Sequence, residues 1–392
     1  MVEWKKLGDI CEIKGRIGFR GYTREDQVEK GNGAISLSPG NIFDSVLNYD
    51  SCTYITWEKY EESPEIMVNE GDIILCKTAS VGKVARVKQL LEKATINPQL
   101  VLIKNIKTNP QYLFYILDDT PFQVKIKGLA GVGSVPNVSQ AKLSSIQIPI
   151  PSLDEQNRIV GILDTFTASV DNLKEQIAQR RKQYEYYRDQ LLDLEGKEGV
   201  EMVKLEDVVS KECTLSYGIV QPGEDIFDGV PVVRPIDLIT TYVYRHGLKN
   251  TTKDISDSYR RTILKGKEIL FCVRGTTGIM SLATQELDGC NVTRGIVPIS
   301  FDNEITKMFV YYQLRSRKLQ KVIADKTNGT ALKQINIKDL RQIKLLIPSL
   351  SEQQRIVDIL DKFEASIQNL EAQLSQREKQ YEYYRNKLLT FE

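Results

Sequence analysis

The chain contains one long segment twice. Residues 151–192 read PSLDEQNRIVGILDTFTASVDNLKEQIAQRRKQYEYYRDQLL, and residues 348–389 read PSLSEQQRIVDILDKFEASIQNLEAQLSQREKQYEYYRNKLL. The two segments align without a gap at an offset of 197 residues, and 28 of their 42 positions are identical. An internal repeat of this quality predicts that the chain is built from two copies of one structural unit.

Weaker similarities extend the repeat over the remainder of the chain. GDIILCKTASVG at Gly71 corresponds to GKEILFCVRGTTG at Gly266, and YLFYIL at Tyr112 corresponds to FVYYQL at Phe309. The order is therefore domain, helix, domain, helix. Because the helical segments are nearly identical while the domains share only a skeleton, we expect the two domains to perform different versions of one task. The predicted segments are residues 1–150, 151–196, 197–347 and 348–392.

Each repeated segment is predicted to be one long helix. Ser152 and Ser349 are N-cap candidates, and a glutamate three residues later completes the capping-box pattern in both copies. Apolar residues then recur at alternating steps of four and three, which is the heptad seam of a coiled coil. The seam consists of Ile159, Leu163, Phe166, Val170, Leu173, Ile177 and Tyr184 in the first copy, and of Ile356, Leu360, Phe363, Ile367, Leu370, Leu374 and Tyr381 in the second.

The connection between the segments fixes how the two helices pair. The first helix leads away from the first domain and the second must lead back, so helices that pack together run antiparallel. About 40 residues at a rise of ~1.5 Å give a rod of roughly 60 Å.

The repeated string KQYEYYR allows two interpretations, a base-stacking surface or a helix core. Tyr184 and Tyr187 lie on the seam, as do their counterparts in the second copy, which favours core packing for two of the three tyrosines. Tyr186 and Tyr383 lie off the seam. With Arg188 and Arg385, they are candidates for docking a partner protein.

The domains read as mixed α/β. Short β-branched runs such as DIILC and EILFCV end in turns rich in Gly, Ser and Thr, and an amphipathic helix is predicted at 110–126 and at 306–323. The fold class is therefore α+β, with two mixed α/β domains in a tandem pseudo-twofold repeat, separated by two long antiparallel coiled-coil helices.

Motifs of catalysis and of metal binding are missing from the sequence. Six cysteines occur without a C-x-x-C pair, the chain has one histidine, and neither a phosphate-binding loop nor a G-x-G-x-x-G turn is present. No apolar run approaches the ~18 residues of a membrane span, so we expect a cytoplasmic protein. The formal net charge of +1 selects no partner class by itself.

The string PSLxEQxRIVxILD occurs twice, each time closing a domain and opening a long helix. In this arrangement the chain resembles the specificity subunit of a Type I restriction-modification system. The resemblance implies two target recognition domains, each reading one half of a split, asymmetric double-stranded DNA sequence. The helices would set the spacer and dock two modification (methyltransferase) subunits, and two restriction (translocase and endonuclease) subunits would complete the assembly.

The same resemblance implies that this chain is not an enzyme by itself and binds no cofactor. S-adenosylmethionine, ATP and magnesium would be held by the partner subunits. Two alternatives remain open: the recognition subunit of a related split restriction enzyme with a fused methylase–nuclease partner, and a coiled-coil scaffold without a DNA role.

Two turns carry the candidate DNA contacts. KTASVGK (77–83) and RGTTG (274–278) combine a cation, hydroxyl groups and glycines, which suits phosphate and base-edge contacts but also suits a solvated turn between strands. The candidate DNA-binding residues are Lys77, Thr78, Ser80, Lys83, Arg234, Arg274, Thr276 and Thr277.

Overall fold

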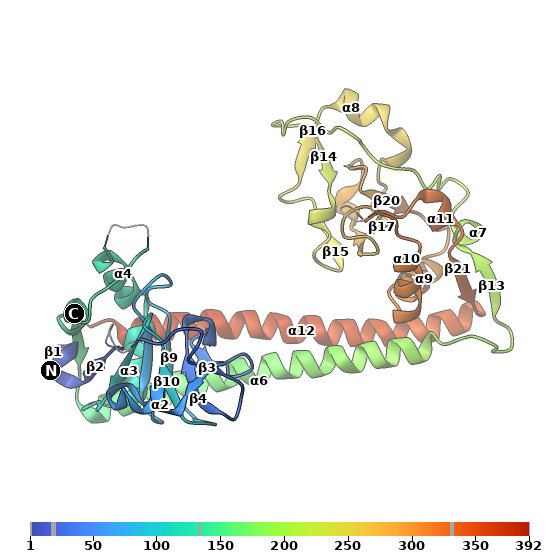
Figure 1. Cartoon of the computed structure of the whole chain (residues 1–392). Helices are drawn as coiled ribbons and strands as arrows, with labels where there is room; N and C mark the ends of the chain where they lie inside the picture. The colour runs from blue at the N-terminus through green and yellow to red at the C-terminus, as the bar shows by residue number, and fades with distance from the viewer. Residues whose placement is uncertain (1, 17–20, 132–134, 330–332, 392) are drawn as a thin grey trace. The chain divides into compact units, whose positions relative to one another are not determined.

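A computed structural model describes residues 2–16, 21–131, 135–329 and 333–391. The chain divides into two compact units, each with its own hydrophobic core. Unit 1 consists of Met1–Asn172 and Gln373–Glu392, and unit 2 consists of Leu173–Ala372. Each unit therefore combines one of the repeated domains with a part of both long helices (Figure 1).

Each repeated segment forms one uninterrupted helix, as the heptad pattern predicts. Ser152 accepts a hydrogen bond at its Oγ from the backbone N–H of Glu155 at 3.4 Å, and Ser349 makes the same bond in the second copy. The glutamate does not close the predicted capping box. Its carboxylate accepts two hydrogen bonds of 2.7 Å from Arg158 instead, and the second copy repeats this pair, because a guanidinium is the stronger donor. The helices are α6, Leu153–Leu191, and α12, Leu350–Leu389.

Unit 1 contains two four-stranded sheets, and β8 is an inner strand of one of them. Every side chain of β8 is buried, as expected for a strand that is covered on both faces. One sheet has the order β2-β11-β8-β9 and is antiparallel, a second has the order β10-β4-β7-β3 with a parallel β10–β4 pair, and β1 pairs with β12. The strands are β1 Glu3–Lys6, β2 Glu12–Lys14, β3 Gln27–Val28, β4 Gly33–Leu37, β7 Thr53–Thr56, β8 Ile73–Cys76, β9 Val84–Arg86, β10 Ala94–Ile96, β11 Leu100–Lys104 and β12 Gln147–Ile150.

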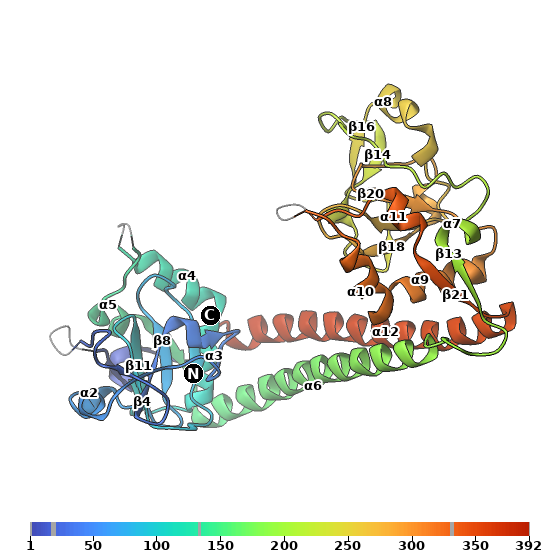
Figure 2. The same cartoon turned by 45° about the vertical axis from the view of Figure 1, so that its right-hand side comes forward.

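Unit 2 repeats this plan, with a second sheet of three strands in place of four. Its sheets have the orders β15-β18-β17-β20 and β16-β14-β19, and β13 pairs antiparallel with β21, beside α7 and α11 in Figure 2. The elements are β13 Glu201–Lys204, α7 Leu205–Val208, β14 Val230–Val233, β15 Tyr242–Val243, β16 Lys249–Thr251, β17 Ile269–Cys272, β18 Met280–Ala283, β19 Asn291–Val292, β20 Ile296–Ile299, α11 Ile337–Arg341 and β21 Lys344–Ile347.

The amphipathic helix expected in each domain is two helices, so that prediction was wrong about continuity. In unit 1 the chain is extended at Asp119, and in unit 2 it is extended at Ser316, whose Oγ accepts the backbone N–H of Leu319 at 3.4 Å. A residue that caps the second helix cannot also continue the first. The helices are α3 Pro110–Asp118 and α4 Thr120–Leu129 in unit 1, and α9 Glu304–Leu314 and α10 Arg317–Asp325 in unit 2.

The long helices are part of both cores. Ile159 and Leu163 of α6 cluster with Leu389 of α12 in unit 1, whereas Ile356 and Leu360 of α12 cluster with the last turns of α6 in unit 2. The start of one helix therefore packs on the end of the other, so the pairing is antiparallel in each unit, as predicted. The fourteen seam residues from Ile159 to Tyr184 and from Ile356 to Tyr381 are buried or half-buried. Tyr187 and Tyr384 are 47% and 41% exposed, so the prediction of core packing was wrong for these two tyrosines, which lie where the helices end. Along the described parts of the chain, none of the helices has the length and apolar content needed to cross a membrane.

Candidate nucleic-acid interface

The first candidate turn, residues 77–83 (turn A), connects β8 to β9. Gly82 donates its backbone N–H to the carbonyl of Cys76 at 3.0 Å, and Cys76 donates to the carbonyl of Lys83 at 2.8 Å. Ala79 and Gly82 have positive φ values of 63° and 100°. These bonds close the turn tightly and present its side chains at the end of a buried strand.

The second candidate turn, residues 273–279 (turn B), connects β17 to β18 in the same way. Gly278 donates to the carbonyl of Cys272 at 2.9 Å, and Cys272 donates to the carbonyl of Ile279 at 2.8 Å. Gly275 and Gly278 have φ values of 88° and 92°. The two turns therefore share one backbone frame, although they have the same residue at one position alone, Gly82 in turn A and Gly278 in turn B.

The frame holds different side chains in the two units. Counted from the cysteine that ends each strand, every polar position that could face a ligand differs in size, charge or donor geometry. The pairs are Lys77 and Val273, Thr78 and Arg274, Ser80 and Thr276, Val81 and Thr277, and Lys83 and Ile279. Such a frame presents two different chemical surfaces from one fold.

Each turn is also joined to the loop that precedes the last short helix of its unit. Thr78 forms a β-bridge with Asn137, and Arg274 forms one with Gln334. The Thr78 hydroxyl donates to the side chain of Asn137 at 2.8 Å. Since both units make this bridge, two loops that are distant in sequence converge at each candidate site.

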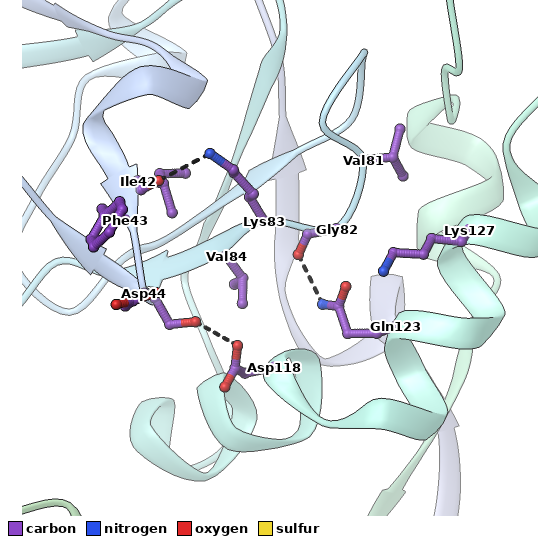
Figure 3. Close-up of a pocket in the computed structure, with 11 residues that line it drawn as sticks. Ile42, Phe43, Asp44, Val81, Gly82, Lys83, Val84, Asp118, Gln123 and Lys127 are labelled. Carbon is purple, nitrogen blue, oxygen red and sulfur yellow. Dashed lines mark hydrogen bonds between the residues drawn. The ribbon is translucent and has the colours of Figure 1, made fainter. Parts of the chain in front are cut away.

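A glutamine fixes each turn to the helix behind it. Gln123 of α4 donates from Nε2 to the carbonyls of Gly82 and Leu117, both at 2.8 Å (Figure 3). Gln320 of α10 donates to the carbonyls of Gly278 at 3.1 Å and of Leu314 at 2.8 Å. These glutamines are not among the site residues predicted from the sequence. Their signal was present, because they are identical residues at the 197 offset within the part of the repeat that has diverged.

Lys83 is partly used within unit 1. Its Nζ donates to the carbonyl of Ile42 at 3.3 Å and to that of Pro39 at 3.4 Å, which ties turn A to the hairpin β5 (Ile42–Phe43) and β6 (Val46–Leu47). A pocket of about 460 Å³ opens at this junction (Figure 3). Phe43 at the hairpin tip lines it and is 69% exposed. This side of turn A therefore offers an apolar ring beside a cation.

The remaining candidates lie in or near turn B. Arg234 is engaged by Asp237 through hydrogen bonds of 3.0 and 2.8 Å, so its charge is neutralised locally. Thr277 donates its hydroxyl to the carbonyl of Lys333 at 3.1 Å, and Thr276 is exposed. The two turns thus bring together Lys77, Thr78, Ser80 and Lys83 in unit 1 and Arg274, Thr276 and Thr277 in unit 2, while Arg234 stands on a neighbouring segment.

The tyrosine-rich helix ends form the same aromatic contacts in both units. In unit 1 Phe166 stacks on Tyr384, with ring centroids 5.2 Å apart. In unit 2 Tyr187 stacks on Phe363 at 5.5 Å. Arg180 and Arg377, which occupy equivalent positions in the two long helices, lie over these phenylalanine rings at 6.0 and 5.8 Å, so their cations add to the aromatic contacts.

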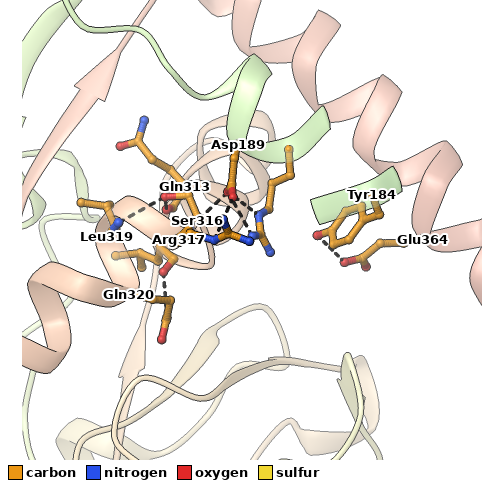
Figure 4. Close-up of polar contacts among 10 residues, drawn as sticks. Tyr184, Asp189, Gln313, Ser316, Arg317, Leu319, Gln320 and Glu364 are labelled. Atoms are coloured by element: carbon orange, nitrogen blue, oxygen red, sulfur yellow. Dashed lines mark hydrogen bonds and ion pairs between the residues drawn. The ribbon is translucent and has the colours of Figure 1, made fainter. Parts of the chain in front are cut away.

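The candidate docking residues divide into two kinds. Tyr186 and Tyr383 are 61% and 60% exposed. Arg188 pairs with Asp189 at 3.0 Å, and Asp189 also accepts the backbone N–H of Arg317 at 3.1 Å (Figure 4). Arg385 pairs with the carboxylates at the end of α3, Asp118 at 3.3 Å and Asp119 at 3.2 Å. The tyrosines therefore present free surface, whereas both arginines contact their own unit.

The carboxylates beside Arg385 lie in a partly desolvated setting. Burial raises the pKa of Asp118 and of Asp119, and the guanidinium of Arg385 acts against this rise. The arrangement is a structural ion pair. Across the residues that the structure describes, no group of three or more His, Cys, Asp or Glu side chains is placed to hold a metal ion.

The comparisons with known proteins agree with the repeat. A family model described as the Type I restriction modification DNA specificity domain matches residues 1–180 and again 197–378. The specificity subunit of the Type I restriction enzyme EcoR124I/EcoR124II from Escherichia coli is 31% identical over 306 residues, which cover 73% of this chain and 72% of that protein. The EcoBI specificity subunit from the same species is 25% identical, over 72% of this chain and 65% of its own length, slightly less than two thirds.

The fold has a solved counterpart. The crystal structure of a Type I restriction-modification S subunit from M. genitalium aligns with a TM-score of 0.58 over 100% of this chain and 97% of that one, at 15% identity. Identity at this level supports a shared fold.

Proposed function

Since the chain belongs to the family of Type I restriction modification DNA specificity domains, we propose that it is the DNA-reading subunit of a Type I restriction-modification complex. Unit 1 and unit 2 each recognise one half of a split double-stranded target. The chain performs no catalysis itself. Methyl transfer, translocation and cleavage belong to two modification and two restriction subunits, which hold S-adenosylmethionine, ATP and magnesium.

The observation that carries this proposal is the pair of turns A and B. One backbone frame appears in both units, closed by equivalent hydrogen bonds and fixed by equivalent glutamines. The exchange of Thr78 for Arg274 within that frame changes a short hydroxyl into a long bidentate donor. Direct readout requires such a combination, because the frame sets the position of the side chain and the side chain selects the base.

The near-identity of the helices supports a second part of the proposal, namely that α6 and α12 dock the modification subunits and set the spacer. Tyr186 and Tyr383 occupy equivalent positions, are identical, and are equally exposed. Two copies of one partner protein require the same surface twice, whereas two different DNA half-sites do not. This favours a protein partner over DNA at the exposed tyrosines.

The test is sequence-dependent DNA binding and modification by the full chain. The chain is produced alone and together with a Type I modification subunit from its own host, and gel shifts are measured on duplexes that carry or lack the motif found by single-molecule methylome sequencing. We expect a split, asymmetric methylated motif and a shift that depends on both halves. A complex that forms but shows neither a methylated motif nor a sequence-dependent shift would leave only the scaffold interpretation.

A further inference from the structure

A small cavity opens beside turn B in unit 2. Its volume is about 330 Å³, and two of its lining side chains are arginines, Arg274 and Arg294. Pro235 and Thr293 form part of the wall, with an apolar floor from Ile219 and Val220. A cavity with an apolar floor and guanidinium groups at its edge suits a flat ligand edge that carries hydrogen-bond acceptors.

The backbone of Arg274 is held from two sides. Its carbonyl accepts the Cys272 thiol at 3.3 Å, its neighbour Gly275 donates to Lys333 at 2.9 Å, and the bridge to Gln334 fixes its place in the turn. The point from which the side chain leaves the turn is therefore set by the fold. A long side chain that starts from a fixed point searches less space before it binds.

The guanidinium of Arg274 is available to a ligand. The side chain is half-buried, and it has no hydrogen-bond or ion-pair partner among the described residues. Arg234, which precedes a residue of the same cavity wall, is by contrast bound by Asp237. A guanidinium carries five donors, and those of Arg274 remain open to solvent, so an external ligand with paired acceptors can bind there without displacing a described protein partner.

The side chain at the equivalent position in unit 1 already has a hydrogen-bond partner within its own unit. Thr78 stands where Arg274 stands, and its hydroxyl donates to Asn137 at 2.8 Å. The available guanidinium donors are therefore a property of unit 2 and not of the shared frame. This contrast separates a residue that helps to hold a turn from one that is available to a ligand.

We propose that Arg274 is a specificity-determining residue of unit 2 and that it reads a guanine in the major groove of its half-site. Guanine presents O6 and N7 as adjacent acceptors, which match the fork of a guanidinium in a bidentate contact. The inference rests on the proposed function and goes beyond it by assigning one base of one half-site to one side chain. Arg294, exposed at the edge of the cavity, stands beside this contact.

The test compares Arg274→Ala and Arg274→Lys with Thr78→Ala as the matched variant in unit 1. Each full-length chain is purified with its modification subunit and assayed for methylation of a duplex library that is randomised in both half-sites. We expect the wild-type motif to contain a G·C pair in the half assigned to unit 2. Both Arg274 variants should lose about 5-fold to 150-fold of the discrimination at that position, because lysine keeps the charge but not the bidentate fork.

The two half-sites control for each other within one molecule. In the Arg274 variants, base selectivity at the half-site of unit 1 should equal that of the wild type, which shows that the variant is folded and assembled. In Thr78→Ala, base selectivity at the half-site of unit 2 should be unchanged. Three results would overturn the inference: a second half-site without a G·C pair, unchanged selectivity in both Arg274 variants, or a uniform loss of affinity for all sequences with a weaker salt dependence. The last result would mean a phosphate contact. A wild-type complex without any motif would refute the proposed function itself, and this inference with it.

Discussion

The glutamines behind the two turns allow a prediction with an internal control. Gln123→Ala removes two hydrogen bonds to backbone carbonyls, those of Gly82 and Leu117. Gln320→Ala removes the corresponding pair in unit 2. Each bond contributes about 0.5–1.5 kcal/mol net, so local opening of a turn should become easier by about 1–3 kcal/mol.

That change in free energy corresponds to amide exchange that is about 5-fold to 150-fold faster in the affected turn. The amides to follow are those that close each frame, Cys76 and Gly82 in turn A and Cys272 and Gly278 in turn B. They are measured by hydrogen–deuterium exchange of the full chain. We expect Gln123→Ala to accelerate exchange in turn A and to leave turn B unchanged, and Gln320→Ala to do the reverse.

Two outcomes would contradict a holding role for these glutamines. Unchanged exchange in both turns would mean that the glutamines do not hold the frame, because each variant removes the Nε2 donor that bonds to the glycine carbonyl. Faster exchange in both turns with either variant would mean global destabilisation. The conservative variants Gln123→Glu and Gln320→Glu preserve the shape of the side chain but lack the amide donor, so they should behave like the alanine variants.

Further predictions concern the helices and the core. Phe166→Ala and Phe363→Ala each remove a stacked ring, and each should lower the free energy of unfolding by about 1–3 kcal/mol in denaturant titrations; an unchanged midpoint would contradict a packed seam. Burial raises the pKa of Cys11 to about 12, so the folded thiol stays protonated near neutral pH and should resist iodoacetamide. Labelling as fast as that of a small thiol would contradict this. Inserting one heptad into α6 and α12 together adds roughly 10 Å to each helix, and the spacer of the methylated motif should change by about 3 base pairs. An unchanged motif at full activity would argue against the spacer role.

The parts of this fold that the sequence predicted are those governed by local and periodic rules. Heptad spacing, the serine N-caps and the antiparallel return of the second helix all follow from the chain alone, and the structure has each of them. The predicted capping box was wrong at Glu155, because Arg158, three residues later, binds the same carboxylate. The prediction of one continuous helix at 110–126 was wrong, because the backbone at Asp119 is extended and a second helix begins after it.

The tandem repeat, with its nearly identical helices and diverged domains, follows from the sequence alone, because repetition and period are properties of the linear chain. The equivalence of diverged positions follows only from the three-dimensional fold. Thr78 and Arg274 occupy one place in one frame, because the bridges to Asn137 and Gln334 and the glutamines of α4 and α10 come from segments distant in sequence. Ion pairs within each unit engage Arg234, Arg188 and Arg385, whereas the Arg274 side chain has no hydrogen-bond or ion-pair partner among the described residues. A side chain's availability depends on which acceptors the fold brings within about 3 Å of it, and no linear pattern encodes that distance.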